Sequence, residues 1–160
     1  MSRLFFIAAC LLTLAACDPV RVYETNQDFD RALWRASDTA IFQFSVPDTS
    51  VRYNVILNVR NSIDYNTSRL FLGYSLSDST NSFSRRRLLE YNLFERKSGK
   101  PFGTSGLGNI YTHQFILEQN IVFPGSCIYD VKLNQMMRVD TLEEILSVGV
   151  RVEKAEKNSD

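Results

Sequence analysis

The thiol of Cys17 is the group whose chemistry the sequence specifies most directly. The residues Leu14-Ala15-Ala16 precede it, so an aliphatic residue and two small residues stand immediately before a cysteine. This is the lipobox pattern, in which the small residues let an extended backbone enter a signal peptidase and the thiol is diacylated before cleavage on its amino side. The sequence therefore predicts cleavage between Ala16 and Cys17, and it predicts membrane lipid as a partner held through acylated Cys17.

Residues 1–16 have the organisation of a lipoprotein signal peptide. Arg3 precedes an uninterrupted apolar run from Leu4 to Leu12, which has the length of a signal-peptide core. This run is too short to cross about 30 Å of hydrocarbon as an anchor helix. The alternatives are an ordinary secretory signal in which Cys17 is incidental, or a buried helix, which the absence of a polar face disfavours.

The chain contains three cysteines, and the amino-terminal segment accounts for two of them. Cys10 would leave with the signal and Cys17 would carry lipid, so Cys127 has no disulfide partner in the exported domain. An apolar core must then stabilise the domain, and a chain of this length can bury one.

The charges balance at 18 Lys+Arg against 18 Asp+Glu, and loss of Arg3 would leave a net charge of −1. Without a basic surplus, we expect no nucleic-acid partner.

Side chains that could catalyse a reaction are present but lack the required spacing. His113 is the only histidine, no ligand spacing supports a zinc site, and no G-x-S-x-G elbow accompanies it. A satisfied histidine within a strand is the preferred interpretation. Glu95, Glu143 and Glu144 show no spacing that would set two carboxylates across a sugar-binding cleft. We therefore predict a protein that is not an enzyme, with no catalytic residue, no metal and no cofactor.

Three further segments have both a chemical and a structural interpretation. Gly103–Gly108 resembles a glycine-rich phosphate loop, but a strand rather than a helix is predicted to follow it, which favours a hairpin loop. Arg85–Arg87 could contact lipid phosphates or an acidic partner, and a solvated strand edge that discourages pairing is preferred. Cys127 is in phase with Tyr129 and Val131, which favours a buried and unreactive thiol.

The candidate partner contacts are Trp34, Arg138 and Asp140. Trp34 lies beside Arg31 and Arg35, and this pattern leaves its burial open. Its ring could stack on a sugar, as aromatic rings do in sandwich-type carbohydrate-binding modules. Arg138 and Asp140 are two residues apart, so in an extended strand their side chains would point the same way and could form an ion pair. A structural role and a role in partner binding both stay open for this pair.

Alternation of apolar and polar residues dominates the rest of the chain and predicts strands. The runs lie at residues 40–46, 51–59, 70–76, 89–93, 111–123, 127–133 and 148–152, with a short first strand near Val20 to Tyr23. Helical periodicity is almost absent, and residues 141–145 would form a single helical turn. The fold class is therefore all-β: a single antiparallel β-sandwich, jelly-roll or immunoglobulin-like, with about eight strands.

The predicted organisation has four parts along the chain. Residues 1–16 form the lipoprotein signal peptide, and residues 17–36 form the lipidated N-terminus and a tether with a short first strand. Residues 37–153 form the β-sandwich domain, and residues 154–160 form a charged flexible tail. The sequence indicates no internal repeat and no second domain.

A series of motifs spans nearly the whole predicted mature chain. They are Cys17-Asp18-Pro19, Arg21-Val22-Tyr23-Glu24, Ala32-Leu33-Trp34, Phe42-Gln43-Phe44, Tyr53 to Ser62, Asp64-Tyr65, Arg69-Leu70-Phe71-Leu72, Gly108-Asn109-Ile110-Tyr111, Met137 to Leu142 and Val148 to Lys154. In type and order they resemble the GldH family of gliding-motility lipoproteins. The resemblance implies a cell-envelope lipoprotein that is a component or accessory of the bacterial gliding machinery, which is linked to type IX secretion. It brings no catalytic activity with it.

Two functions follow as expectations. The first is a membrane-tethered, non-enzymatic protein-interaction module that serves gliding motility, with envelope proteins of that machinery as partners. The alternative is a lipid-anchored carbohydrate-binding β-sandwich, for which Trp34 would be the stacking residue, and no other feature supports a glycan partner. Because no acidic run that would signal surface export follows Cys17, we expect the protein at the outer membrane, facing the periplasm.

Overall fold

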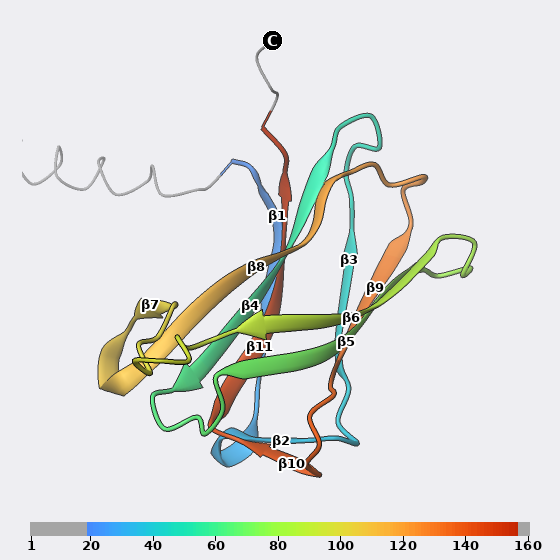
Figure 1. Cartoon of the computed structure of the whole chain (residues 1–160). Helices are drawn as coiled ribbons and strands as arrows, with labels where there is room; N and C mark the ends of the chain where they lie inside the picture. Colours follow the sequence, from blue (N-terminus) through green and yellow to red (C-terminus); the bar gives the residue numbers. More distant parts are fainter. Residues whose placement is uncertain (1–18, 157–160) are drawn as a thin grey trace, which may run out of the picture.

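The computed structural model describes residues 19–156, which form two antiparallel β-sheets packed face to face (Figure 1). In spatial order, the first sheet contains β1 (Arg21–Asp28), β11 (Ile145–Lys154), β4 (Tyr53–Ser62), β8 (Ile110–Ile121) and β7 (Thr104–Ser105). The second sheet contains β3 (Ala40–Ser45), β9 (Ile128–Gln135), β5 (Arg69–Asp78) and β6 (Ser84–Asn92). The remaining elements are the paired strands β10 (Thr141–Glu143) and β2 (Leu33–Arg35) and the 3₁₀ turns η2 (Asp30–Ala32) and η3 (Leu107–Asn109). The prediction of an all-β antiparallel sandwich is confirmed.

The long strands pair as a nested series, which makes the fold a jelly roll rather than an immunoglobulin-like sandwich. β5 and β6 form the central hairpin, and around it β4 pairs with β8, β3 with β9, and β1 with β11. Each nested pair lies in the opposite sheet from the pair before it. A long hairpin that wraps around itself in this way is the jelly-roll arrangement. The first and last long strands of the chain are therefore hydrogen-bonded neighbours.

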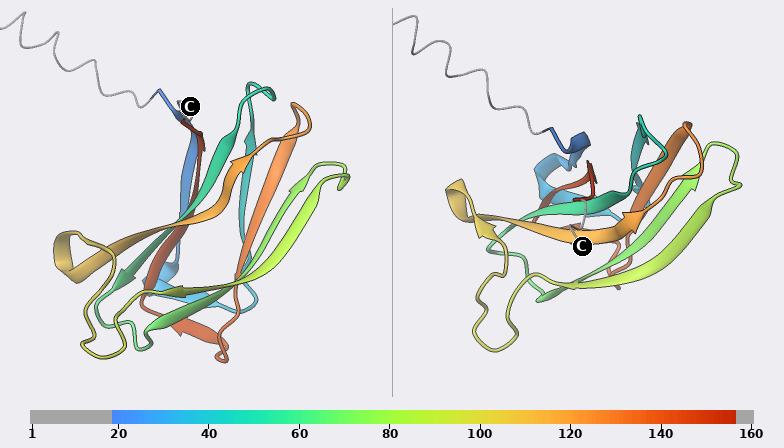
Figure 2. Two further views of the ribbon diagram at one scale, coloured as in Figure 1. Left: turned by 45° about the horizontal axis from the view of Figure 1, so that its top comes forward. Right: turned by 90° about the horizontal axis from the view of Figure 1, so that it is seen from above.

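The strand directions define two ends of the sandwich, which we call the entry end and the distal end. The entry end holds both termini of the described chain, next to Arg21 and Lys154, and the connections 46–52, 79–83 and 122–127. In Figure 1 this end lies at the top, with the β5–β6 hairpin to one side, and Figure 2 shows it from two further directions. The distal end holds the connections 29–39, 63–68, 93–109 and 136–144.

Alternate residues along the strands face the interior and build one core. In β9, Tyr129, Val131 and Leu133 are fully buried, as the period-two pattern predicts. Tyr53 and Tyr74, at inward positions of β4 and β5, are also buried. Because the inward residues of both sheets belong to a single apolar cluster, packing between the sheets positions every loop discussed below.

Two segments differ in detail from their expected conformation. Residues 141–145, predicted as a helical turn, contain β10 instead, and Glu144 then adopts a positive φ of 65° before β11. The prediction was wrong because β2 offers this short segment a hydrogen-bonding partner that its own residues do not reveal. In the stretch 17–36, the described part contains β2 and an eight-residue β1, which pairs with β11 from Arg21 to Asp28.

Candidate functional site

Residues 136–140 form a bent loop between β9 and β10 at the distal end, and we call it the 136–140 loop. It carries two of the candidate contact residues, Arg138 and Asp140, and both are exposed. The loop also exposes two apolar side chains, since Met136 is 54% exposed and Val139 is 49% exposed. Because the segment bends rather than extends, the expected ion pair is corrected: none joins Arg138 to Asp140 in the described chain.

Hydrogen bonds with Gln135 and Ala36 hold the backbone of the 136–140 loop. The amide of the buried Gln135 accepts the Met137 N–H at 2.8 Å through Oε1 and donates to Val139 O at 2.9 Å through Nε2. At the far side of the loop, the Ala36 N–H donates to Asp140 O at 2.8 Å. The exposed side chains therefore stand on an ordered backbone, which lowers the entropy lost when a partner binds. Sequence reasoning missed Gln135, whose polar side chain occupies an inward position of β9.

The third candidate contact, Trp34, lies inside the molecule. Its ring is fully buried and stacks on Phe29 with centroids 4.8 Å apart, and Nε1 donates to Asp38 O at 2.8 Å. Trp34 is also the strand partner of Leu142, so it supports the ribbon that follows the 136–140 loop. Its burial, which the sequence left open, is thereby decided, and the candidate role of Trp34 as a partner or sugar contact is corrected, because a ring in this position offers no face to either.

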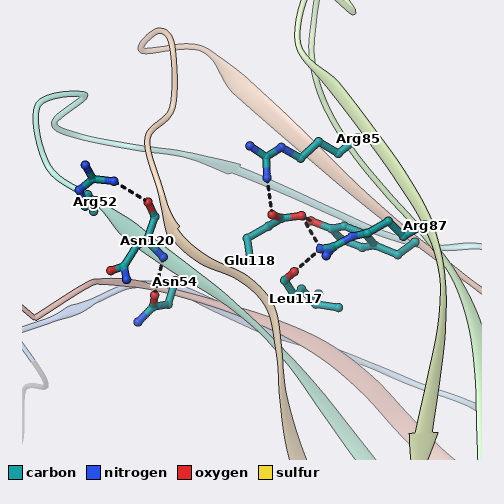
Figure 3. Close-up of polar contacts among 8 residues, drawn as sticks. Arg52, Asn54, Arg85, Arg87, Leu117, Glu118 and Asn120 are labelled. Carbon is teal, nitrogen blue, oxygen red and sulfur yellow. Dashed lines mark hydrogen bonds and ion pairs between the residues drawn. The ribbon is translucent and has the colours of Figure 1, made fainter.

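A second polar cluster joins β6 to β8 and is centred on Glu118, which is only 5% exposed (Figure 3). The cause is a β-bulge: Val55 of β4 pairs with Glu118 and Ile56 pairs with Ile116, so Leu117 is an extra residue. As a result, Leu117 and Glu118 both face the interior. The bulge thus places a carboxylate between the sheets. The sequence signal that could have indicated it is the polar Gln119, which stands where the alternation of Phe115, Leu117 and Ile121 calls for an apolar residue.

Two arginines of β6 neutralise this carboxylate. Arg85 Nη1 lies 2.6 Å from Glu118 Oε2, and Arg87 Nη2 lies 2.6 Å from Glu118 Oε1 and also donates to Leu117 O. The hydroxyl of Tyr74 donates to Oε1 at 3.1 Å. Residues 85–87 lie in β6, an edge strand of the second sheet, and all three are exposed, as expected for a solvated strand edge. What sequence reasoning missed is that the guanidiniums of Arg85 and Arg87 also reach the buried carboxylate of Glu118.

The electrostatics of this cluster suit a structural clasp. Burial, and next the neighbouring carboxylate of Glu118, raise the pKa of Tyr74 well above its ordinary value, so its hydroxyl stays protonated and donates. The guanidinium of Arg87 also lies over the Tyr74 ring, 5.3 Å from its centroid. Both oxygens of the Glu118 carboxylate accept charge-assisted hydrogen bonds, so the role of this group is to hold β6 against β8.

Nearer the start of β8, His113 packs among aromatic rings. It stacks on Phe115 with centroids 5.9 Å apart, and Phe115 stacks on Tyr91 of β6 with centroids 4.0 Å apart. Burial lowers the pKa of His113 to about 4, so the ring is neutral at pH 7. Its Nε2 atom is buried without a hydrogen-bond partner and faces Gly103, which corrects the expectation of a fully satisfied histidine.

The remaining candidates lie apart from one another. Gly103–Gly108 contains β7 and the start of η3 and leads into β8, as expected for a hairpin loop. Cys127 is half-buried rather than buried.

Within residues 19–156, no group of three His, Cys, Asp or Glu side chains is arranged to hold a metal ion, and no helix is long and apolar enough to cross a membrane. The predicted lipidation and cleavage at Cys17 and Ala16 lie outside the described residues.

The fold and its polar groups define a jelly-roll β-sandwich whose main buried charge cluster, around Glu118, is an internal clasp. Residues 21–152 match the family described as GldH lipoprotein, and the chain belongs to this family. It is 27% identical to the gliding motility lipoprotein GldH homolog of Christiangramia forsetii, over 95% of each chain. It is 28% identical to the gliding motility lipoprotein GldH of Flavobacterium johnsoniae, over 96% of each chain.

Among solved structures, the chain is similar to part of the 4-O-methyl-α-glucuronidase BtGH115A. The sequence identity is 10% and the TM-score is 0.49, and the match covers 88% of this chain and 18% of that chain. The present chain thus spans a small part of that enzyme, and we carry none of its properties over.

Proposed function

We propose that this protein is a lipid-anchored, non-enzymatic component of the bacterial gliding-motility machinery that binds another envelope protein. The gliding role is supported by its two relatives, which are both named gliding motility lipoproteins. The interaction role rests on the 136–140 loop, where Met136, Arg138 and Val139 are exposed on a backbone held by Gln135. Apolar side chains beside an arginine, on an ordered backbone, suit recognition of a protein partner.

The proposed anchor and the 136–140 loop lie at opposite ends of the sandwich. The chain from Cys17 to Arg21 spans at most about 14 Å when fully extended. From there β1 runs for eight residues, about 26 Å, toward the distal end. The loop then stands clear of the membrane surface, where a partner in the periplasm can reach it. We place the protein at the outer membrane, facing the periplasm, and connect it to type IX secretion through the machinery it serves.

The first test is deletion of the gene in a gliding host. We expect loss of colony spreading and of single-cell movement, both restored when the wild-type gene is returned. Normal movement after deletion would contradict the gliding role. The variant Cys17→Ser should fail to restore movement and should appear in the soluble fraction, because it has no thiol to acylate.

The second test separates the 136–140 loop from other exposed apolar positions. Met136→Ser should lower movement and lower the yield of a defined adduct formed from a photo-crosslinking residue at Val139. The matched control is Ile116→Ser on the outer face of β8, because Ile116 is 52% exposed and Met136 is 54% exposed. The control should leave both movement and adduct unchanged. Equal losses for the two variants would contradict a specific role for the loop.

A further inference from the structure

We infer that the entry end of the sandwich lies against the phospholipid headgroups of the membrane that holds the anchor. The inference rests on the proposed lipidation of Cys17 and adds an orientation to it. The chain from Cys17 to Arg21 spans at most about 14 Å, so the entry end stays beside the bilayer whatever path those residues take. The distal end has no such restraint.

Charged side chains are distributed unequally between the two ends. The entry-end connections 46–52, 79–83 and 122–127 comprise 18 residues, of which only Asp48 and Arg52 are charged. The distal connections comprise 43 residues, of which thirteen are charged: Asp30, Arg31, Arg35, Asp38, Asp64, Glu95, Arg96, Lys97, Lys100, Arg138, Asp140, Glu143 and Glu144. A surface that loses water against headgroups is less costly when few charges must be desolvated. The asymmetry therefore favours the bilayer at the entry end and the aqueous space at the distal end.

The entry-end loops also satisfy much of their own hydrogen bonding. The Tyr53 hydroxyl donates to Asp48 O at 2.7 Å and accepts the Asp48 N–H at 3.3 Å. The Tyr129 hydroxyl does the same for Gly125, at 2.7 Å and 3.2 Å. Both tyrosine rings pack on Phe123, which holds the two loops in place. Because these backbone groups already have hydrogen-bond partners, fewer polar groups of the loops are left without a partner at the membrane interface, which is less polar than water.

The surface of the entry end combines apolar side chains and prolines. Val122 is 48% exposed, and Pro47 and Pro124 are exposed in the neighbouring loops. Proline has no backbone N–H that would need a hydrogen-bond acceptor at a membrane interface. An apolar side chain at the level of the headgroups replaces contact with water by contact with the upper part of the lipid.

Beside these residues a cavity of ≈ 700 Å³ is lined by two cations, Arg52 and Lys154, and one acid, Glu156. The carboxylate of Asp48 is also near, since it bonds to Ser50 in the cavity wall and interacts with Lys154. Its wall is ordered, because Arg52 Nη1 donates to Asn120 O at 3.2 Å (Figure 3) and the Ala155 N–H donates to Arg52 O at 2.8 Å. The cationic ends of Arg52 and Lys154 at this depth can contact the phosphates of phospholipid headgroups. The occupant that we assign to this cavity is therefore a headgroup of the anchoring membrane.

The test uses the full-length lipoprotein in vesicles of phosphatidylethanolamine and phosphatidylglycerol. In a Cys127→Ser background, the variants Val122→Cys and Val139→Cys each carry a bimane label on the introduced thiol, and the vesicles contain a lipid spin-labelled on its headgroup. The two positions form a matched pair, because Val122 is 48% exposed at the entry end and Val139 is 49% exposed at the distal end. We expect the label at 122 to lose more than half of its fluorescence and the label at 139 to lose almost none.

Equal quenching at the two positions, or stronger quenching at 139, would overturn the inference. Arg52→Gln combined with Lys154→Gln should reduce quenching at 122, and unchanged quenching would overturn the assignment of these cations to headgroups. Buried Trp34, the only tryptophan, reports through its fluorescence that each variant is folded. The outcome is independent of the proposed gliding role, since a protein can lie on the bilayer in this orientation whether or not its deletion stops gliding.

Discussion

The Nη2 atom of Arg87 in β6 lies 2.6 Å from Oε1 of Glu118 in β8, and this pair ties the edge strand of one sheet to the bulged strand of the other. Arg85 binds the second carboxylate oxygen at 2.6 Å. One inward acidic side chain, placed there where the register of β8 against β4 shifts, thus joins the two sheets along this edge.

Removing the Glu118 carboxylate should destabilise the fold, because two guanidiniums and the buried Tyr74 hydroxyl lose their acceptor. We expect Glu118→Ala to lower the free energy of unfolding by about 2–4 kcal/mol. Urea denaturation followed by the fluorescence of the single tryptophan, Trp34, measures this change. The control is Arg86→Ala, an exposed neighbour on the other face of β6, which should change stability by less than about 0.5 kcal/mol. Similar losses in the two variants would show that Glu118 does not clasp the sheets.

The buried His113 should make stability depend on pH. Its pKa is about 4 in the folded protein against an ordinary value of 6.5, because burial disfavours the charged ring. Between these values the unfolded chain binds more protons, so the free energy of unfolding falls as the pH falls from 6.5 to 4. The slope contributed is at most about 1.4 kcal/mol per pH unit.

The variant His113→Leu isolates this contribution, since carboxylates also titrate in the window. Between pH 6.5 and 4 we expect the free energy of unfolding of this variant to depend less on pH than that of the wild type. The difference in slope corresponds to at most one proton taken up on unfolding. Parallel curves for the two proteins would mean that His113 titrates equally in the folded and unfolded states.

Gly103 should not tolerate a larger residue. A Cβ atom at this position would lie 2.8 Å from His113 Nε2 and 2.8 Å from Thr112 O, and the backbone oxygen cannot move aside easily. Gly103→Ala should therefore cost about 1–3 kcal/mol of stability in thermal or urea unfolding. Gly125→Ala, where nothing lies within 4 Å, is the control and should be neutral or slightly stabilising.

Gln135 should control the order of the 136–140 loop without touching its exposed side chains. Gln135→Leu leaves the Met137 N–H without its acceptor, so this amide should exchange with solvent much faster, and stability should fall by about 1–3 kcal/mol. The crosslinked adduct at Val139 should fall with it. Gln43→Leu, at an exposed position of β3, should change neither measurement. Slow exchange of Met137 in the Gln135 variant would show that the loop is ordered by other contacts.

Local patterns determined much of the architecture in advance. In β3 and β9 one face of the strand is buried, so apolar and polar residues alternate within each segment and the strand can be predicted from that segment alone. The polar residues 47–50 likewise indicate the turn after β3 without reference to the rest of the chain. The same information indicated that Gly103–Gly108 leads into a strand rather than a helix. The lipobox at Cys17 is likewise a local signal, because a peptidase reads it in an extended chain.

The tertiary structure decided what depends on distant partners. Arg85 and Glu118 are 33 residues apart, and only the nested pairing and the bulge at Leu117 bring them together. Trp34 is buried because β2 meets β10, more than a hundred residues later in the chain. The sequence by itself thus determined the strands, the sandwich and the predicted site of lipidation, since these depend on neighbouring residues. The jelly-roll order, the inward turn of Glu118 and the exposure of the 136–140 loop required the folded chain, because burial and charge pairing are properties of the whole packed molecule.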